Sequence, residues 1–253
     1  MTALLEVRNL RKRFGGIRAL DDVSLEVRAN EAVGLIGPNG AGKTTLFDCI
    51  SGVQRADRGR VDLAGERIDD LGVYRRARLG IGRTFQRLEL FSAMTAREHM
   101  LVAERERRGD GSLLKDLLWK GAPRRDEIAR VDELLDELGL EELADAPIES
   151  LSLGQGRLVE LGRALMRGPR LLLLDEPSSG LDSLESARLA ALLRDICERR
   201  QIATLVVEHD LELVHSLAQR VYVMDFGSII GAGTLEDVLG ESSVRRAYLG
   251  DEV

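Results

Sequence analysis

One short segment constrains this sequence more than any other: Gly-Pro-Asn-Gly-Ala-Gly-Lys-Thr-Thr at positions 37–45, directly after the apolar run 32–36. Its spacing matches the pattern Gly-x4-Gly-Lys-Ser/Thr, and the apolar run predicts the buried parallel strand that should precede such a loop. Glycines let the backbone bend so that successive N–H groups point inward, and a helix beginning near Lys43 adds the positive end of its dipole. The segment therefore predicts a phosphate-binding loop (P-loop) between a strand and a helix.

The side chains of this loop are suited to holding a nucleotide. Lys43 supplies a positive charge for the β- and γ-phosphates, and the Thr44 hydroxyl is a ligand for Mg²⁺. The simpler alternative is a glycine-rich turn with an incidental lysine, and the strand in front of the loop argues against it. The predicted nucleotide-binding residues of the segment are Gly37, Pro38, Asn39, Gly40, Ala41, Gly42, Lys43, Thr44 and Thr45.

A second apolar run, 171–174, ends in Asp175 and Glu176. A P-loop needs an acidic group at a second strand end to hold its metal, and we predict that Asp175 reaches Mg²⁺ through water. Glu176 lies one residue further, where a carboxylate could accept a proton from water attacking the γ-phosphate. A strand followed by a solvated turn would give the same pattern, so this interpretation depends on the loop at 37–45.

The segment Leu-Ser-Leu-Gly-Gln at 151–155, placed between the two phosphate motifs, resembles the signature of the ATP-binding cassette (ABC) family, and the resemblance covers nearly the whole chain. It implies that Ser152, Gly154 and Gln155 lie at a helix N-terminus and contact the ATP held by a second subunit. The helix itself is expected at 157–166. Leu153 stands where the commonest form of the family has glycine. An ordinary helix start capped by serine is the simpler alternative.

Four further positions match those of the family. Gln86 resembles the glutamine that meets Mg²⁺ and the attacking water, and His209 resembles the histidine that contacts the γ-phosphate. Phe14 resembles the aromatic residue that stacks on adenine, and Asp182 resembles the acid of a loop that crosses the dimer interface. The predicted catalytic residues are thus Glu176, His209, Gln86 and Lys43, and the predicted metal ligands are Thr44, Gln86 and Asp175.

The predicted fold is α/β: a P-loop NTPase core with a parallel sheet flanked by helices, an N-terminal antiparallel β subdomain, and a helical subdomain that carries the signature. Alternation with period 2 indicates the antiparallel strands, and short apolar runs indicate the parallel ones. The expected strands are 4–10 and 23–27 in the β subdomain, and 32–36, 171–174 and 204–207 in the core.

The helical subdomain is expected over about 95–167. Thr95 followed by Glu98 has the spacing of a capping box, and the segment 125–138 places its apolar residues on one helical face. The charged segments 104–111 and 120–123 are predicted to be solvated connections. A single cassette would then span 1–253, with 1–94 and 168–253 forming the RecA-like and β core and a C-terminal tail at about 234–253.

Composition narrows the classes of partner. The net charge of -7 argues against nucleic acid, and an aromatic content of 4% argues against single-strand binding in particular. Cys49 and Cys197 form no Cys-x-x-Cys pair and suit a reduced compartment. No apolar run approaches the ~18 residues of a spanning helix. If the protein works at a membrane, we expect it to be soluble when isolated and to be carried there by another subunit.

The sequence holds one P-loop, so two catalytic sites require two chains, as a homodimer or with a paralogous ATP-binding subunit. The finer resemblance is to the branched-chain amino acid uptake group. It rests on segment 83–95, the Glu-His-Asp around His209, the insertion near 113–119 and the closing segment 246–250. It implies transmembrane permease subunits, an external solute-binding protein, and a peripheral position at the cytoplasmic face of the plasma (inner) membrane.

Several alternatives stay open beside this reading. Lipopolysaccharide export and urea or amide uptake systems use close relatives. A soluble ABC ATPase of DNA repair or translation would need long coiled coils or a second cassette, and a guanine-specific Asn-Lys-x-Asp segment of GTPases is missing from the sequence. Phe91 is the candidate contact for a permease helix, although it could equally be core of the helical lobe. His99 and His215 match no motif and are predicted to be ordinary surface or packing residues.

Overall fold

The computed structural model describes residues 3–84, 90–108 and 123–249. The chain divides into two units, Met1–Arg83 with Arg170–Val253 and Thr84–Pro169. The division expected from the sequence fell at 94/95 and 167/168. The observed limits lie after the strand Ile81–Arg83 and just before the strand Leu171–Asp175. None of the helices in the described segments is both long and apolar enough to cross a membrane.

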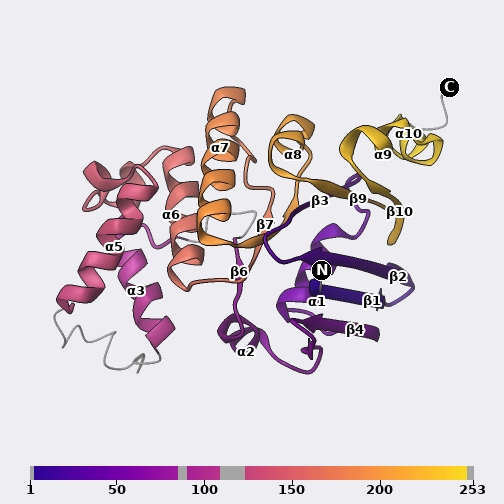
Figure 1. Ribbon diagram of the computed structural model, residues 1–253, viewed down its shortest axis with the longest axis horizontal. Coiled ribbons are helices and arrows are strands. Elements are labelled where there is room, and N and C mark those ends of the chain that lie inside the picture. The colour runs from indigo at the N-terminus through magenta and orange to yellow at the C-terminus, as the bar shows by residue number, and fades with distance from the viewer. Residues whose placement is uncertain (1–2, 85–89, 109–122, 250–253) are drawn as a thin grey trace. The chain divides into compact units, whose positions relative to one another are not determined.

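The first unit contains an antiparallel sheet whose strands follow the order β2-β1-β4-β5. Two of its strands are longer than their alternating cores at 4–10 and 23–27, because pairing continues through charged residues to a tight turn, where Phe14 lies opposite Ile17. Figure 1 shows β1, β2 and β4 side by side. The strands are β1 (Ala3–Phe14), β2 (Ile17–Arg28), β4 (Arg58–Leu63) and β5 (Glu66–Arg67).

The second sheet of this unit has the order β10-β9-β3-β8-β7-β6. Five of its strands are parallel, and β10 runs antiparallel to β9. Every residue of the strands predicted from apolar runs is buried, which confirms that these runs form central strands covered on both faces. The strands are β3 (Ala32–Ile36), β6 (Ile81–Arg83), β7 (Leu171–Asp175), β8 (Ala203–Val207), β9 (Arg220–Asp225) and β10 (Ser228–Gly233).

Helices cover both faces of this parallel sheet. Consecutive residues of β3 point to opposite faces, so Leu35 packs with Phe47 of α1 and with the antiparallel sheet. Ile36 packs on the other face with Val214 of α8, and with Val238 and Val244 of the C-terminal helices. The segment expected as a tail from about 234 is therefore packed on the core. The helices of this unit are α1 (Lys43–Ser51), α2 (Val73–Arg78), α7 (Ser183–Arg200), α8 (Leu211–Leu217), α9 (Leu235–Gly240) and α10 (Ser242–Leu249).

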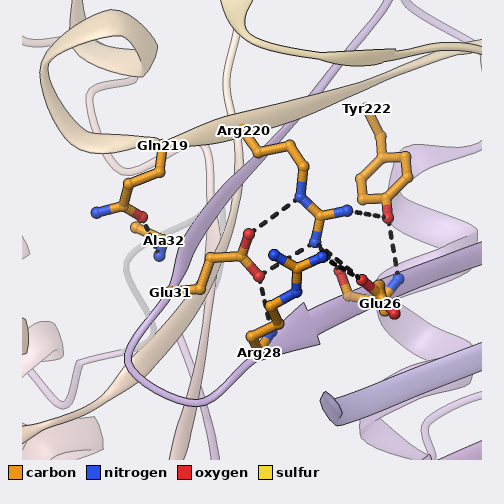
Figure 2. A network of polar contacts seen from close by, with 7 residues as sticks. All are labelled: Glu26, Arg28, Glu31, Ala32, Gln219, Arg220 and Tyr222. Atoms are coloured by element: carbon orange, nitrogen blue, oxygen red, sulfur yellow. Dashed lines mark hydrogen bonds and ion pairs between the residues drawn. The ribbon is translucent and has the colours of Figure 1, made fainter. Parts of the chain in front are cut away.

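A polar network joins the two sheets of the first unit at the turn between β2 and β3 (Figure 2). The guanidinium of Arg220, on β9, donates to both carboxylate oxygens of Glu31, at 3.0 and 3.1 Å. It also donates to the backbone oxygen of Glu26 at 3.0 Å and to the hydroxyl of Tyr222 at 2.8 Å. Because a bidentate pair fixes orientation as well as distance, this network sets the start of β3 and thereby the P-loop at its other end.

The second unit is helical. It contains α3 (Ala96–Arg108), α5 (Arg125–Glu137), two short 3-10 turns (Glu141–Leu143 and Ile148–Ser150) and α6 (Leu153–Met166). The predicted capping box is confirmed, since the Glu98 N–H donates to the Thr95 hydroxyl at 3.2 Å and the Thr95 N–H donates to the Glu98 carboxylate at 2.8 Å. The predicted apolar face of α5 is buried at Val131, Leu134 and Leu135.

The prediction that 104–111 forms a solvated connection is wrong for its first part, because α3 continues to Arg108. Glu104 is 0% exposed and accepts hydrogen bonds from Arg107 at 2.8 Å and Arg108 at 2.7 Å, with Arg130 of α5 at 3.6 Å. Burial raises the pKa of Glu104, but the arginines outweigh it and bring that pKa to about 2. The run of charges pairs along the helix instead of breaking it. Residues 109–111 and 120–122, and the insertion at 113–119, lie outside the described residues.

Candidate active site

The P-loop is shaped by backbone contacts that exclude side chains. A Cβ atom at Gly37 would lie 2.0 Å from the backbone oxygen of Met224, and one at Gly42 would lie 2.3 Å from that of Ala19. Both glycines have positive φ, 150° and 104°, which favours glycine independently of space. The Gly227 N–H donates to the Ala41 oxygen at 2.9 Å. The β9–β10 turn therefore holds the loop from one side.

Lys43 is the first residue of α1 and is buried. Its Nζ donates to the backbone oxygens of Gly37 at 2.7 Å and Pro38 at 2.9 Å, which folds the side chain back across the loop. Burial lowers the pKa of Lys43, and the carboxylates of Glu176 and Asp175 act in the opposite direction. Among the described residues no side chain caps α1, so the N–H groups of its first turn suit an anion.

The buried carboxylate of Asp175 ends β7. Its Oδ2 accepts a hydrogen bond from the Arg83 guanidinium at 3.0 Å. Burial raises the pKa of Asp175, while Arg83 lowers it. A carboxylate at this strand end and the hydroxyl of Thr44 in the first turn of α1 are oxygen donors of the type that Mg²⁺ accepts, so the donor set fits that ion.

Glu176 follows directly and lies in an uncommon backbone conformation, with φ at 48°. Its N–H donates to the Val207 oxygen at 2.9 Å, so the turn is fixed against the end of β8. Its Oε1 lies 3.2 Å from Nε2 of His209. The structure thus brings together Glu176 and His209, which the sequence separates by more than the length of α7.

Glu208 is a second buried acid at this edge, and it is 2% exposed. Its Oε1 accepts from the N–H and the hydroxyl of Ser178, at 2.8 and 2.7 Å. Its Oε2 accepts from the His209 N–H at 3.0 Å and from the Asp210 N–H at 3.4 Å. Glu208 therefore joins the loop after β7 to the loop after β8.

A cavity of about 370 Å³ opens between these two loops. Acidic and hydroxyl side chains dominate its wall, and Glu176 and His209 both reach it. The lining residues are Glu176, Ser178, Ser179, Leu181, Asp182, Ser183, Ser186, Glu208, His209 and Asp210.

Comparison with known proteins shows the family of this chain. A family model described as "ABC transporter" matches residues 20–179, which include the P-loop, the segment 151–155 and the acidic pair. The chain belongs to the ABC transporter family. As an ATP-binding cassette of that family it binds ATP and ADP, and it hydrolyses ATP.

Three relatives match this cassette over nearly their full length. The high-affinity branched-chain amino acid transport ATP-binding protein BraF of Pseudomonas aeruginosa is 39% identical over 98% of both chains. The lipopolysaccharide export system ATP-binding protein LptB of Haemophilus influenzae is 35% identical over 99% of this chain and 98% of its own. The ADP conformation of MJ1267, an ATP-binding cassette of an ABC transporter, superposes with a TM-score of 0.88 at 33% identity, covering 99% and 100% of the two chains.

Two more predicted residues of the cassette are placed on the first unit. Phe14 lies at the end of β1, 46% exposed, with Nζ of Lys12 5.2 Å from its ring centroid. An exposed ring of this kind offers a face on which a base can stack. Asp182 caps α7, where its Oδ1 accepts from the Glu185 N–H at 2.8 Å. Gln86 lies outside the described residues.

The signature segment begins α6 in the second unit of the cassette. The Ser152 hydroxyl accepts from the Gln155 N–H at 3.2 Å, and the Gln155 side chain accepts from the Ser152 N–H at 2.9 Å. This capping box starts the helix at Leu153, whereas the sequence placed its start at 157. Leu153 is 43% exposed at this helix end. His99, predicted to be a surface or packing residue, stacks on Phe91, with the two ring centroids 5.9 Å apart.

Sequence reasoning missed two residues of the site, Glu208 and Arg83. A signal existed for Glu208, because Glu-His-Asp follows the apolar run 204–207 much as Asp-Glu follows the apolar run 171–174. For Arg83 the only signal was a charged residue at the end of a short apolar strand, and nothing in the sequence indicated its partners.

Proposed function

We propose that this cassette drives solute import across the plasma membrane, as one of two ATP-binding subunits attached to transmembrane permease subunits. The observation that carries the proposal is the contact between Glu176 Oε1 and His209 Nε2 at 3.2 Å. Both residues follow the carboxyl ends of parallel strands, at the same edge of the sheet as the P-loop. This arrangement suits the hydrolysis of a phosphoanhydride, and family membership supports its use in transport.

In this proposal Lys43 and the N–H groups of the P-loop hold the β- and γ-phosphates of ATP. Water attacks the γ-phosphorus, the bond to the bridging oxygen breaks, and the proton of the water passes to the Glu176 carboxylate. His209 orients that carboxylate from 3.2 Å and contacts the γ-phosphate. Phe14 stacks on the adenine. Gln86, which lies outside the described residues, would contact the attacking water and Mg²⁺, as the family resemblance implies.

Thr44 and Asp175 would hold Mg²⁺, which fits their oxygen donors. When bound, the ion neutralises charge on the phosphates. The chain's own contribution is a hydroxyl in the first turn of α1 and a buried carboxylate at the end of β7.

The second half of each site comes from a second chain. Ser152, Gly154 and Gln155 lie at the start of α6, where N–H groups and a helix dipole suit an anion. We propose that they close on the ATP held by the other P-loop, and that Asp182 lies at this dimer interface. ATP binding then closes the pair and hydrolysis opens it, which supplies movement to the permease at the cytoplasmic face of the membrane.

For the solute we propose branched-chain amino acids, delivered by an external binding protein. The name and 39% identity of BraF support this class over the 35% identity of LptB. Lipopolysaccharide export is the second candidate. Solute choice belongs to the permease and the external protein, so this part of the proposal rests on relatives alone.

Uptake of labelled leucine tests the proposal. Cells that lack the gene should lose high-affinity uptake of leucine, isoleucine and valine, the wild-type gene should restore it, and the Glu176→Gln variant should not. Unchanged uptake of all three amino acids would reject this substrate class. Unchanged uptake together with a defect in surface lipopolysaccharide would favour the export alternative.

A further inference from the structure

Arg83 connects α1, which carries the proposed metal ligand Thr44, to β7, which carries the proposed metal ligand Asp175. From the end of β6 its guanidinium donates to Asp175 Oδ2 at 3.0 Å, to Asp48 Oδ1 at 2.6 Å and to the Ser51 hydroxyl at 2.9 Å. We propose that Arg83 is a positioning residue that holds the Asp175 carboxylate in place to receive Mg²⁺ before the nucleotide arrives. This inference rests on the proposed magnesium site.

The sheet register places Arg83 beside Asp175. β6 pairs in parallel with β7, and Arg83 lies opposite Leu173. Side chains alternate along a strand, so Asp175 lies on the same face of the sheet as Leu173. It lies two residues closer to the carboxyl end of β7, at the edge of the sheet where the P-loop follows β3. An arginine is long enough to reach forward over that distance. The sheet order, in which β6 is the neighbour of β7, makes this pairing available.

Arg83 also forms hydrogen bonds with two side chains of α1. Asp48 and Ser51 lie one helical turn apart on the same face, and the guanidinium carbon of Arg83 also lies 5.9 Å from the ring centroid of Phe47. The same helix carries Thr44 in its first turn. Arg83 therefore connects the helix that offers the hydroxyl ligand to the strand that offers the carboxylate ligand.

Charge and burial give this contact a functional consequence. Asp175 and the Arg83 side chain are both buried, at 4% and 9% side-chain exposure. A buried carboxylate without a paired charge is strongly unfavourable, so Arg83 provides the opposite charge while no cation is bound. Partners that orient a metal ligand in this way typically contribute tenfold or more to metal affinity. If Arg83 instead competed with the metal for Asp175, removing it would strengthen metal binding.

The test separates metal use from nucleotide binding. The dissociation constant of ADP is measured with the full chain, once with excess EDTA and once with saturating Mg²⁺. The readout is the magnesium ratio, which is the value with EDTA divided by the value with Mg²⁺. In R83M the value with EDTA should stay within about threefold of wild type, while the ratio should fall by about tenfold or more. R83K keeps the charge but cannot span both carboxylates, and it should restore part of the ratio.

Arg76 offers a matched control. It is also buried, and it also anchors α1, by donating to the backbone oxygens of Cys49 at 2.6 Å and Ile50 at 2.8 Å. Its partners do not include Asp175 among the bonds described for it. R76M should lower stability and leave the magnesium ratio unchanged, as a purely structural arginine would.

A wild-type ratio in R83M, or a ratio above it, overturns the inference. If R83M fails to fold, R83K decides: its ratio must lie below that of wild type, and an equal ratio overturns the inference. A wild-type chain whose ADP affinity does not respond to Mg²⁺ overturns the magnesium site itself, and the role of Arg83 with it.

Discussion

Replacing Glu208 by glutamine tests the link between the loops after β7 and β8. The glutamine oxygen can keep both bonds from Ser178, at 2.8 and 2.7 Å, but its NH2 group then faces the N–H groups of His209 and Asp210. One good bond to a charged acceptor, worth about 1.5–3 kcal/mol, is lost, and a buried donor is left unsatisfied. We therefore expect E208Q to lower the free energy of unfolding by about 3 kcal/mol.

Equilibrium unfolding in urea, followed by circular dichroism, measures this change. Glu212 is a matched control, because it lies exposed on the first turn of α8, and E212Q should stay within about 0.5 kcal/mol of wild type. ATP turnover by E208Q should fall as well, since the backbone of His209 loses its anchor. A loss of stability below about 1 kcal/mol would refute the reasoning, because it would mean that the carboxylate charge of Glu208 carries none of these bonds.

Three further predictions follow from the same structure. K43A should weaken ADP binding, measured by calorimetry, because the buried Nζ places a positive charge against the backbone of the P-loop; an unaltered affinity would count against the proposed role of Lys43. E176Q should bind ATP normally yet stop turnover and accumulate an ATP-dependent dimer in size-exclusion chromatography, and wild-type turnover would remove Glu176 from its proposed role. Glu104 has its pKa lowered from 4.5 to about 2, so its contribution, on the order of 3 kcal/mol, is complete above pH 4.5 and is lost as the pH falls toward 2. The stability difference between wild type and E104Q should therefore shrink over that interval, and a constant difference would contradict the assignment.

The C-terminal region shows a limit of prediction from sequence patterns. The region from about 234 is predicted to be a tail, and the helices that it forms are short. Of their apolar residues, Val238 and Val244 are buried against Ile36 of β3, whereas Leu239 is 36% exposed. Such short patterns carry too little periodicity to predict packing, which depends on what the adjacent strands offer.

The sequence by itself determined the contiguous motifs of this protein: the P-loop at 37–45, the acidic pair at 175–176, the signature at 151–155 and the capping box of Thr95 and Glu98. These features are local, because backbone conformation and a few neighbouring side chains set their geometry. Only the tertiary structure could show that Arg83 reaches Asp175, 92 positions away in the chain, or that Glu208 holds Ser178, 30 positions away. Those contacts depend on strand order and on burial. Burial is what makes a charged pair strong, and it exists only once the sheet has assembled.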